Sequence, residues 1–321
     1  MEYRRLGRTG LKVSTICLGT MQFGWSTDAS GAFAILDEAI TQGINFIDTA
    51  DVYSRWVDGN DGGVSEQIIG DWLRQSSVRR QDVILATKVR GRMGDGPNDE
   101  GLSRQHILNA AADSLRRLQT DYIDLYQVHW PDEETPLDET LQALTDLVRD
   151  GKVRYIGCSN YPAWLLTKSL WISDVKNLAR FDSLQPHYSL VHRAEFEREL
   201  QPLCLDQGIG VIPYSPLAGG FLTGKYRRDT PLPQSVRAGG VQSRYMNEQG
   251  FTAVDKLAES GAAHNATVAQ MAIAWVLANP AVTSAIIGAN SIAQLVDTLG
   301  GTVVALHPDE KAALDATTAW K

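Results

Sequence analysis

The sequence is poor in cysteine, lacks long apolar runs and carries no excess of positive charge. Its three cysteines, Cys17, Cys158 and Cys204, lie far apart, and no CxxC spacing occurs. Two of them fall in apolar runs that are typical of strands, so buried, inert thiols are the better interpretation. The low count fits a reducing compartment.

No uninterrupted apolar run reaches the roughly 20 residues that a membrane-spanning helix needs. The segment MEYRRLGRTG has no apolar stretch after its arginines, so we expect no signal peptide and a cytoplasmic protein. The formal net charge of -8 and the pI of about 5.3 argue against a general binder of nucleic acid or anionic membranes, because such binders use Lys and Arg to neutralise phosphates. A local basic pocket for one phosphorylated cofactor is still compatible with this charge.

Short apolar runs alternate with longer segments of helical spacing along the whole chain. Strand-like runs occupy residues 16–20, 45–50, 83–88, 123–129, 153–159, 182–186, 210–216 and 285–288. Helical spacing is found, for example, at residues 32–42, 103–118, 137–149, 193–207 and 268–278. Near-continuous apolar strands predict a parallel sheet covered on both faces, and eight strands can close into a barrel. The alternative, an open doubly wound sheet, would be expected to carry an early GxGxxG turn, and no early Gly-rich turn has that spacing.

The predicted fold class is therefore α/β, a (β/α)8 TIM barrel with an N-terminal β-hairpin cap. A chain of 321 residues suits one such barrel as a single domain, residues 1–321. We expect residues 3–15, with LGRTG at their centre, to form the hairpin at the N-terminal end of the barrel. Gly43 and Gly151 are expected to end the helices before them. The longest irregular stretch, at about 217–250, is predicted to be a cofactor or substrate loop, because loops of this length are usually functional or mobile.

Polar residues at the C-terminal ends of the strands are the candidates for chemistry, because active sites of such barrels lie there. The second, third and fourth strands offer Asp48, Tyr53, Lys88 and His129. Each group alone has an ordinary structural interpretation, but the four groups together at one mouth of the barrel can form a proton-donating site. A phenol has a pKa of about 10, and an adjacent ammonium, itself held by a carboxylate, lowers it. We therefore assign Tyr53 as general acid, Lys88 as the group that tunes it, Asp48 as the anchor of Lys88, and His129 as the group that orients a carbonyl.

The order of several segments resembles the aldo-keto reductase superfamily over nearly the whole chain. The segments are FIDTADVY, ATK, QVHW, GCSN, SLQPHYSL, IPYSPLAGG and IIGANSIAQL, preceded by LGRTGLKVSTICLGTMQFG. The resemblance implies the same tetrad and transfer of the pro-R hydride from C4 of NADP(H) or NAD(H). It implies carboxamide-binding residues at Ser159, Asn160 and Gln185 and a nicotinamide-stacking aromatic at Tyr214. It places adenosine contacts at Gly288, Asn290, Gln294, Asp297 and Thr298.

The seventh strand and the turn after it suit a dinucleotide on their own chemistry. The aromatic face of Tyr214 matches a flat nicotinamide ring. Ser215, Leu217 and Gly219 follow it, and glycine lets backbone amides approach a pyrophosphate closely. Lys225 is then the expected countercharge. A flexible turn and a solvated lysine are the structural alternatives.

Two further expectations concern specificity. Many relatives carry Lys or Arg near the position of Asn290, but this chain has none there, so we expect NADPH to be preferred only modestly, with NADH usable. The mouth loops hold Trp25, Trp56 and Trp130, which, with Phe23, are predicted to wall an apolar or sugar-stacking pocket for an aldehyde, ketone or sugar.

Two other classes of function stay open at this stage. A metal-dependent barrel hydrolase would also gather His and Asp at strand ends, but it needs several converging ligands, and neither HxH nor HExxH occurs. We therefore expect no metal. A regulatory protein that keeps the barrel and the cofactor with little turnover, as in relatives that serve as channel subunits, is the second alternative.

Overall fold

Eight parallel strands form the central sheet of the computed structural model, which describes residues 1–320. In sheet order the strands run β10-β3-β4-β5-β6-β7-β8-β9. Their bounds are β3 Ile16–Gly19, β4 Phe46–Asp48, β5 Ile84–Val89, β6 Ile123–Val128, β7 Val153–Ser159, β8 Phe181–Gln185, β9 Gly210–Val211 and β10 Ala285–Ile287. Each strand pairs in parallel with its neighbour, so all eight C-terminal ends point to one side.

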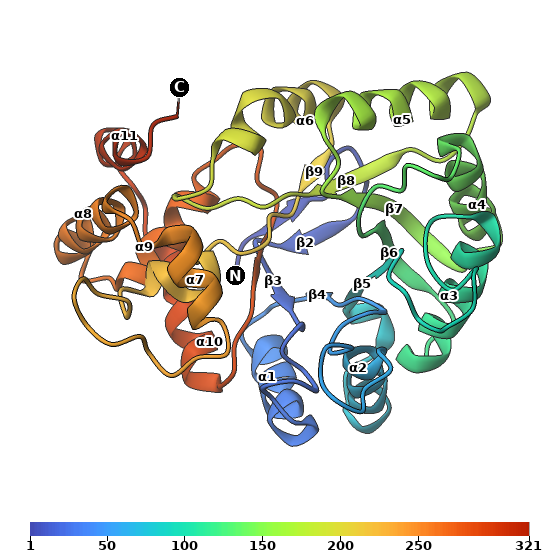
Figure 1. The fold of residues 1–321 in the computed structure, drawn as a ribbon, viewed down its shortest axis with the longest axis horizontal. Coiled ribbons are helices and arrows are strands. Elements are labelled where there is room, and N and C mark those ends of the chain that lie inside the picture. The colour runs from blue at the N-terminus through green and yellow to red at the C-terminus, as the bar shows by residue number, and fades with distance from the viewer. Residues whose placement is uncertain (321) are drawn as a thin grey trace.

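The two end strands of this sheet meet and close the ring. The amide of Thr283 donates to the carbonyl oxygen of Val211 at 2.8 Å, and the amide of Ile286 donates to that of Pro213 at 2.9 Å. Figure 1 shows the strands curling around a common centre with the helices outside them. The predicted (β/α)8 barrel is confirmed.

Helices surround the strands, and some of them pack on other helices rather than on a strand (Figure 1). They are α1 Ala29–Thr41, α2 Val64–Gln75, α3 Arg104–Leu118, α4 Leu137–Arg149, α5 Ala163–Lys176, α6 Gln201–Gln207, α7 Ala238–Tyr245, α8 Glu248–His264, α9 Val268–Leu277, α10 Ile292–Leu299 and α11 Pro308–Thr317. Asp28 and Ser103 cap α1 and α3 by accepting from backbone amides three residues on. Gly43 and Gly151 follow α1 and α4 with positive φ of 83° and 71°, as helix-ending glycines do.

The N-terminal hairpin closes the end of the barrel opposite the site. Strands β1 (Tyr3–Arg5) and β2 (Lys12–Ser14) pair antiparallel. Leu6 and Val13 pack with inward-facing strand residues such as Phe46 and Leu125 in one buried cluster. The hairpin predicted at residues 3–15 is therefore present, and it seals the inner core from the N-terminal side. The three cysteines are free and buried, as predicted.

The structure differs from the sequence-based prediction in the seventh strand of the barrel and in the long segment that follows it. The strand predicted at 210–216 is regular only over Gly210–Val211, because Pro213 and Pro216 have no amide hydrogen to donate. The stretch predicted to be irregular at 217–250 contains a 3₁₀ helix, Ala218–Thr223, and the helix α7. Several of its apolar side chains, Phe221 and Tyr245 among them, are buried, and their burial holds the segment against the barrel. Within residues 1–320, no helix has the length and apolarity that crossing a bilayer requires.

Candidate active site

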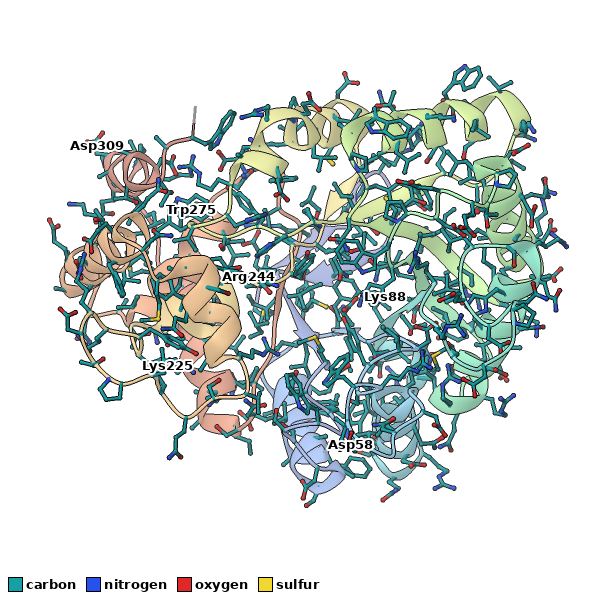
Figure 2. The ribbon with its side chains drawn as sticks, in the orientation of Figure 1. Asp58, Lys88, Lys225, Arg244, Trp275 and Asp309 are labelled. Atoms are coloured by element: carbon teal, nitrogen blue, oxygen red, sulfur yellow. The ribbon has the colours of Figure 1, made fainter. Side chains whose placement is uncertain are left out.

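Three of the predicted catalytic side chains meet in one hydrogen-bonded group, in which Asp48 and Lys88 are buried and Tyr53 is half-buried. Asp48 ends β4, Lys88 lies near the end of β5, and Tyr53 follows β4 by a short turn. The Lys88 Nζ lies 2.5 Å from Asp48 Oδ1, 2.7 Å from the Thr49 carbonyl oxygen and 2.9 Å from Tyr53 Oη. The ammonium thus has three acceptors for its three hydrogens. Figure 2 shows Lys88 within the ring of strands.

The carboxylate of Asp48 is fixed from its other side by two amides. Gln127 Nε2 and Gln185 Nε2 donate to Asp48 Oδ2 at 3.0 and 2.9 Å. Burial by itself lowers the pKa of the Lys88 ammonium, but the charge and hydrogen bond of Asp48, assisted by Tyr53, outweigh burial and raise that pKa above its ordinary value. Lys88 therefore stays charged although its side chain is fully buried.

The acidity of Tyr53 results from opposing effects. Burial raises its pKa, the Lys88 ammonium lowers it, and Asp48 raises it again, with a net increase over the ordinary value. The sequence suggested a lowered pKa, and the difference arises because desolvation of the phenolate outweighs the ammonium. Tyr53 consequently carries its proton at neutral pH, and Lys88 limits how far its pKa rises.

The imidazole of His129 completes the group as a neutral ring. It follows β6, and its ring lies edge-on to that of Tyr53 with 5.9 Å between centroids. Burial, together with the charges of Lys88 and Arg90, lowers the pKa of His129 to about 3. A neutral imidazole carries one N–H that can donate to an oxygen placed between the two rings.

The predicted carboxamide-binding residues lie next to this group in a continuous network. Asn160 Nδ2 donates to the His129 carbonyl oxygen and to Ser159 Oγ, both at 3.0 Å. Tyr214 Oη donates to Asn160 Oδ1 at 2.9 Å, and Ser159 Oγ donates to the Gln185 carbonyl oxygen at 2.8 Å. The network joins the ends of β7 and β8 to Tyr214, so these four predicted residues are brought together.

A turn of unusual backbone conformation follows Tyr214. Ser215 and Ala218 have positive φ of 55° and 50°, and Gly219 and Gly220 have 67° and 96°. Non-glycine residues rarely adopt this region, and such strain is concentrated at functional sites. Lys225 lies at this turn: its Nζ is 3.3 Å from the point where a Cβ on Gly220 would sit.

The residues predicted to contact adenosine come from the end of β10 and from helix α10. Gly288 and Asn290 are exposed just after the strand, and Gln294 is exposed in the first turn of α10, where its Oε1 accepts from the Asn290 amide at 2.9 Å. Asn290 Oδ1 accepts from Ser26 Oγ and Thr27 Oγ1, which ties this end to the loop before α1.

The last two predicted adenosine contacts have partners within the scaffold. Asp297 Oδ1 accepts from Gln270 Nε2 at the start of α9, at 3.2 Å. The Thr298 hydroxyl donates to the carbonyl oxygen of Gln294 in its own helix. Leu217 is half-buried beside the turn.

The tryptophans predicted to contact substrate lie on two sides of the mouth. Trp25 and Trp56 meet edge to face at 5.5 Å, and Trp56 lies 6.4 Å from the Tyr53 ring. Trp130 instead lines a cavity of about 510 Å³ together with Asn160 and Tyr214. Phe23 is fully buried in the outer core, so its predicted place in the pocket wall is wrong: its ring packs between the barrel and the helices.

Sequence reasoning missed two side chains near the mouth. Arg237 comes from the long segment, and its Cζ lies 6.0 Å from the Trp25 ring. Burial lowers the pKa of Arg237, although Tyr53 and Tyr226 oppose that change. His187 stacks on Tyr214, with ring centroids 5.1 Å apart. The spacing of strand ends does not predict that either side chain lies near the mouth. The only signal for His187 is its place directly after the SLQP segment at the end of β8.

Converging metal ligands form no part of the described site. Among residues 1–320, no three His, Cys, Asp or Glu side chains gather in a way that could hold a metal ion.

The site is therefore a hydrogen-bonded Asp–Lys–Tyr group at the C-terminal mouth of an eight-stranded (β/α)8 barrel. The family model for the Aldo/keto reductase family matches residues 15–319, and the chain belongs to that family. It is 43% identical over 314 residues to the uncharacterized oxidoreductase YrpG of Bacillus subtilis, covering 96% of this chain and 93% of that protein. The family identifies the chain as an oxidoreductase that acts on carbonyl groups.

Two other relatives have more specific names. Versiconal hemiacetal acetate reductase of Aspergillus parasiticus is 35% identical, with 97% of this chain and 95% of that protein covered. A probable voltage-gated potassium channel subunit beta of Arabidopsis thaliana is 36% identical, with 93% and 90% covered.

Proposed function

We propose that this protein reduces the carbonyl group of an aldehyde, ketone or sugar to an alcohol, using NAD(P)H as hydride donor and Tyr53 as general acid. The observation that carries this proposal is the contact of 2.9 Å between Lys88 Nζ and Tyr53 Oη, with Asp48 on the same ammonium at 2.5 Å. A phenol otherwise too weak as an acid gains a fixed cation that stabilises its phenolate at the moment the proton leaves.

The residues present fit a nicotinamide dinucleotide. Asn160 and Gln185 offer their amide oxygens as acceptors beside Ser159, which suits the amino group of a carboxamide, whereas their amide nitrogens already donate within the protein. A carboxamide that used Asn160 Oδ1 would compete with the hydroxyl of Tyr214 for it. The positive-φ turn through Gly219 lets backbone approach a pyrophosphate closely.

The proposed chemistry divides between the cofactor and the side chains. The reduced nicotinamide, when bound, supplies a hydride to the carbonyl carbon. Tyr53 donates its proton to the carbonyl oxygen as negative charge develops there. His129, neutral at physiological pH, donates a hydrogen bond to the same oxygen and fixes its position. The Lys88 ammonium, which Asp48 holds in place, stays charged during the step and stabilises the phenolate that remains on Tyr53.

The charges near the mouth favour no more than a modest preference for NADPH over NADH. Lys225 lies against the Gly220 turn, where a pyrophosphate would pass, and in Figure 2 it is well apart from Lys88, towards α7. Arg228 is engaged by Asp255 at 2.8 Å and by Glu248 at 3.4 Å. The uncharged Asn290 would bind a 2′-phosphate far less selectively than a guanidinium would.

A panel of aldehydes, ketones and sugars, followed by NADPH absorbance, tests the proposal. At least one carbonyl compound should be reduced, and Tyr53→Phe should lower kcat/KM for it by about 10²–10⁴-fold, the usual contribution of a placed general acid. Cofactor affinity should stay the same. If the variant keeps near wild-type turnover, or if its cofactor affinity falls in parallel, Tyr53 is not the acid.

A regulatory role is the second candidate, favoured by the similarity to proteins named as potassium channel beta subunits. It predicts tight cofactor binding and slow cofactor release with negligible steady-state turnover on the whole panel. Multiple turnovers on any aldehyde at a rate set by the concentration of substrate would count against it.

A further inference from the structure

A column of stacked rings stands behind the proposed nicotinamide platform, Tyr214. The His187 ring lies nearly parallel to the Tyr214 ring, at 11° with 5.1 Å between centroids. On its other face the ring of His187 stacks on that of His192, at 18° and 3.8 Å. Both faces of the His187 imidazole are therefore covered by rings, and one face of Tyr214 is covered by His187.

Hydrogen bonds hold two of the three rings, Tyr214 at one end of the column and His187 in its middle. The Tyr214 hydroxyl donates to Asn160 Oδ1 at 2.9 Å. The Tyr245 hydroxyl lies 3.1 Å from His187 Nε2, and Tyr245 belongs to α7, in the long segment after β9. The backbone ties the same residues together, because the Tyr214 amide donates to the Pro186 carbonyl oxygen at 2.9 Å. The plane of the Tyr214 ring is thus set from two directions, by a hydrogen bond at its tip and by a ring behind it.

The charge state of His187 suits a stacking role. Burial, together with the nearby His192 and Arg244, lowers the pKa of His187 to about 3. The ring is neutral under physiological conditions, so it contributes an aromatic face rather than a cation beside a positively charged oxidised nicotinamide.

We propose that His187 is a positioning residue for cofactor binding: its ring holds the plane of Tyr214, so that the free face of Tyr214 is ready to stack on the nicotinamide. This inference rests on the proposed function. The link through Tyr245 further couples the platform to the segment that carries Lys225, which we assign to the pyrophosphate. Neither His187 nor Tyr245 is placed at the reacting atoms, so His187 should affect the binding of the cofactor and not the hydride step.

Substitutions that separate the ring from its hydrogen bond provide the test. His187→Phe keeps an aromatic ring and loses the partner of Tyr245. His187→Gln keeps a polar group and loses the ring. We expect the dissociation constant for NADPH, measured by fluorescence titration, to stay within about twofold of wild type in His187→Phe. It should rise about two- to tenfold in His187→Gln, the usual range for an aromatic stacking contact.

A double-mutant cycle with Tyr214→Ala distinguishes positioning from a general effect on the fold. If His187 acts through the Tyr214 ring, the Gln substitution should have no further effect on NADPH affinity once that ring is absent. The KM for NADPH should rise in His187→Gln while kcat at saturating cofactor stays unchanged. Melting temperatures of both His187 variants report whether each is folded.

The outcomes separate this inference from the proposed function. Wild-type NADPH affinity in His187→Gln would overturn it, as would equal losses in both variants or a full additional loss in the Tyr214→Ala background. If the wild-type protein binds neither NADPH nor NADH, the proposed function itself fails. If it binds NADPH and the two variants behave as expected, the inference about His187 stands, and turnover on the carbonyl panel tests the proposed reduction separately.

Discussion

Replacing Lys88 by Met should move the pH dependence of the reaction upward. Oxidation of an alcohol needs Tyr53 as phenolate, so the acidic limb of kcat/KM for oxidation follows the pKa of Tyr53. Lys88 is the group that lowers this pKa, against burial and Asp48. Without the ammonium the phenolate forms only at higher pH, and the limb shifts to higher pH.

The magnitude follows from the distances. Lys88 Nζ lies 2.9 Å from Tyr53 Oη and 4.7 Å from the centre of the ring, over which the phenolate charge is partly spread. Unit charges about 4 Å apart interact by about 4 kcal/mol at an effective dielectric constant of about 20, which corresponds to roughly three pKa units. Asp48 lies at 2.5 Å from the same ammonium and offsets part of this effect. We therefore expect an upward shift of about one to three pH units.

The assay is the pH profile of alcohol oxidation with NADP⁺, with Lys225→Met as a matched control. Lys225 is exposed in the segment after β9 and should leave the limb unmoved. Removing Lys88 leaves Asp48 as a buried, unpaired carboxylate, which is destabilising, so the double variant with Asp48→Asn serves as a folded comparison. An unchanged acidic limb in a folded Lys88→Met protein that retains activity would remove Lys88 from the mechanism.

Three other substitutions test the remaining assignments. His129→Gln should lower kcat/KM for reduction by about 10²–10³-fold, as loss of a donor to a developing oxyanion does. Since the pKa of His129 is about 3, the wild-type pH profile of kcat/KM should show no limb from this residue between pH 5 and 8. A limb in that range that His129→Gln abolishes would refute the neutral state. Tyr214→Ala should weaken NADPH binding about two- to tenfold with little change in kcat at saturation, and equal affinity in a fluorescence titration would argue against the stacking assignment. Asn290→Arg should increase the ratio of kcat/KM for NADPH over NADH, and Asn290→Ala is the control for the lost contacts to Ser26 and Thr27. No change in the ratio would mean that this position does not face the ribose. A wild-type preference for NADPH above about 10³-fold would show that a cation already reaches the 2′-phosphate.

Local patterns in the sequence predict much of the architecture. Apolar runs of strand length that alternate with helical spacing predict a parallel barrel, and seven of the eight strands lie within a residue or two of their predicted bounds. Strand position also brings Asp48 and Lys88 together, because neighbouring parallel strands end at the same level. Candidate residues can therefore be found in such a fold without knowing any contact.

The local pattern is less informative where tertiary packing decides the conformation. The segment 217–250 looks irregular because Gly and Pro interrupt its periodicity, yet burial of Phe221, Val241 and Tyr245 allows α7 to form. Phe23 resembles a mouth residue by its place in a loop, but its side chain turns into the outer core.

Electrostatic balance and long-range pairing depend on the tertiary structure alone. The sequence placed an ammonium beside a phenol and correctly identified its direction of influence, but the net pKa of Tyr53 depends on how far the fold removes it from water. The partner of Asp297 on α9, the approach of Arg237 to Trp25, and the stack of His187 on Tyr214 join residues from different loops. Their spacing along the chain does not encode these contacts, because only closure of the barrel brings the loops to the same mouth.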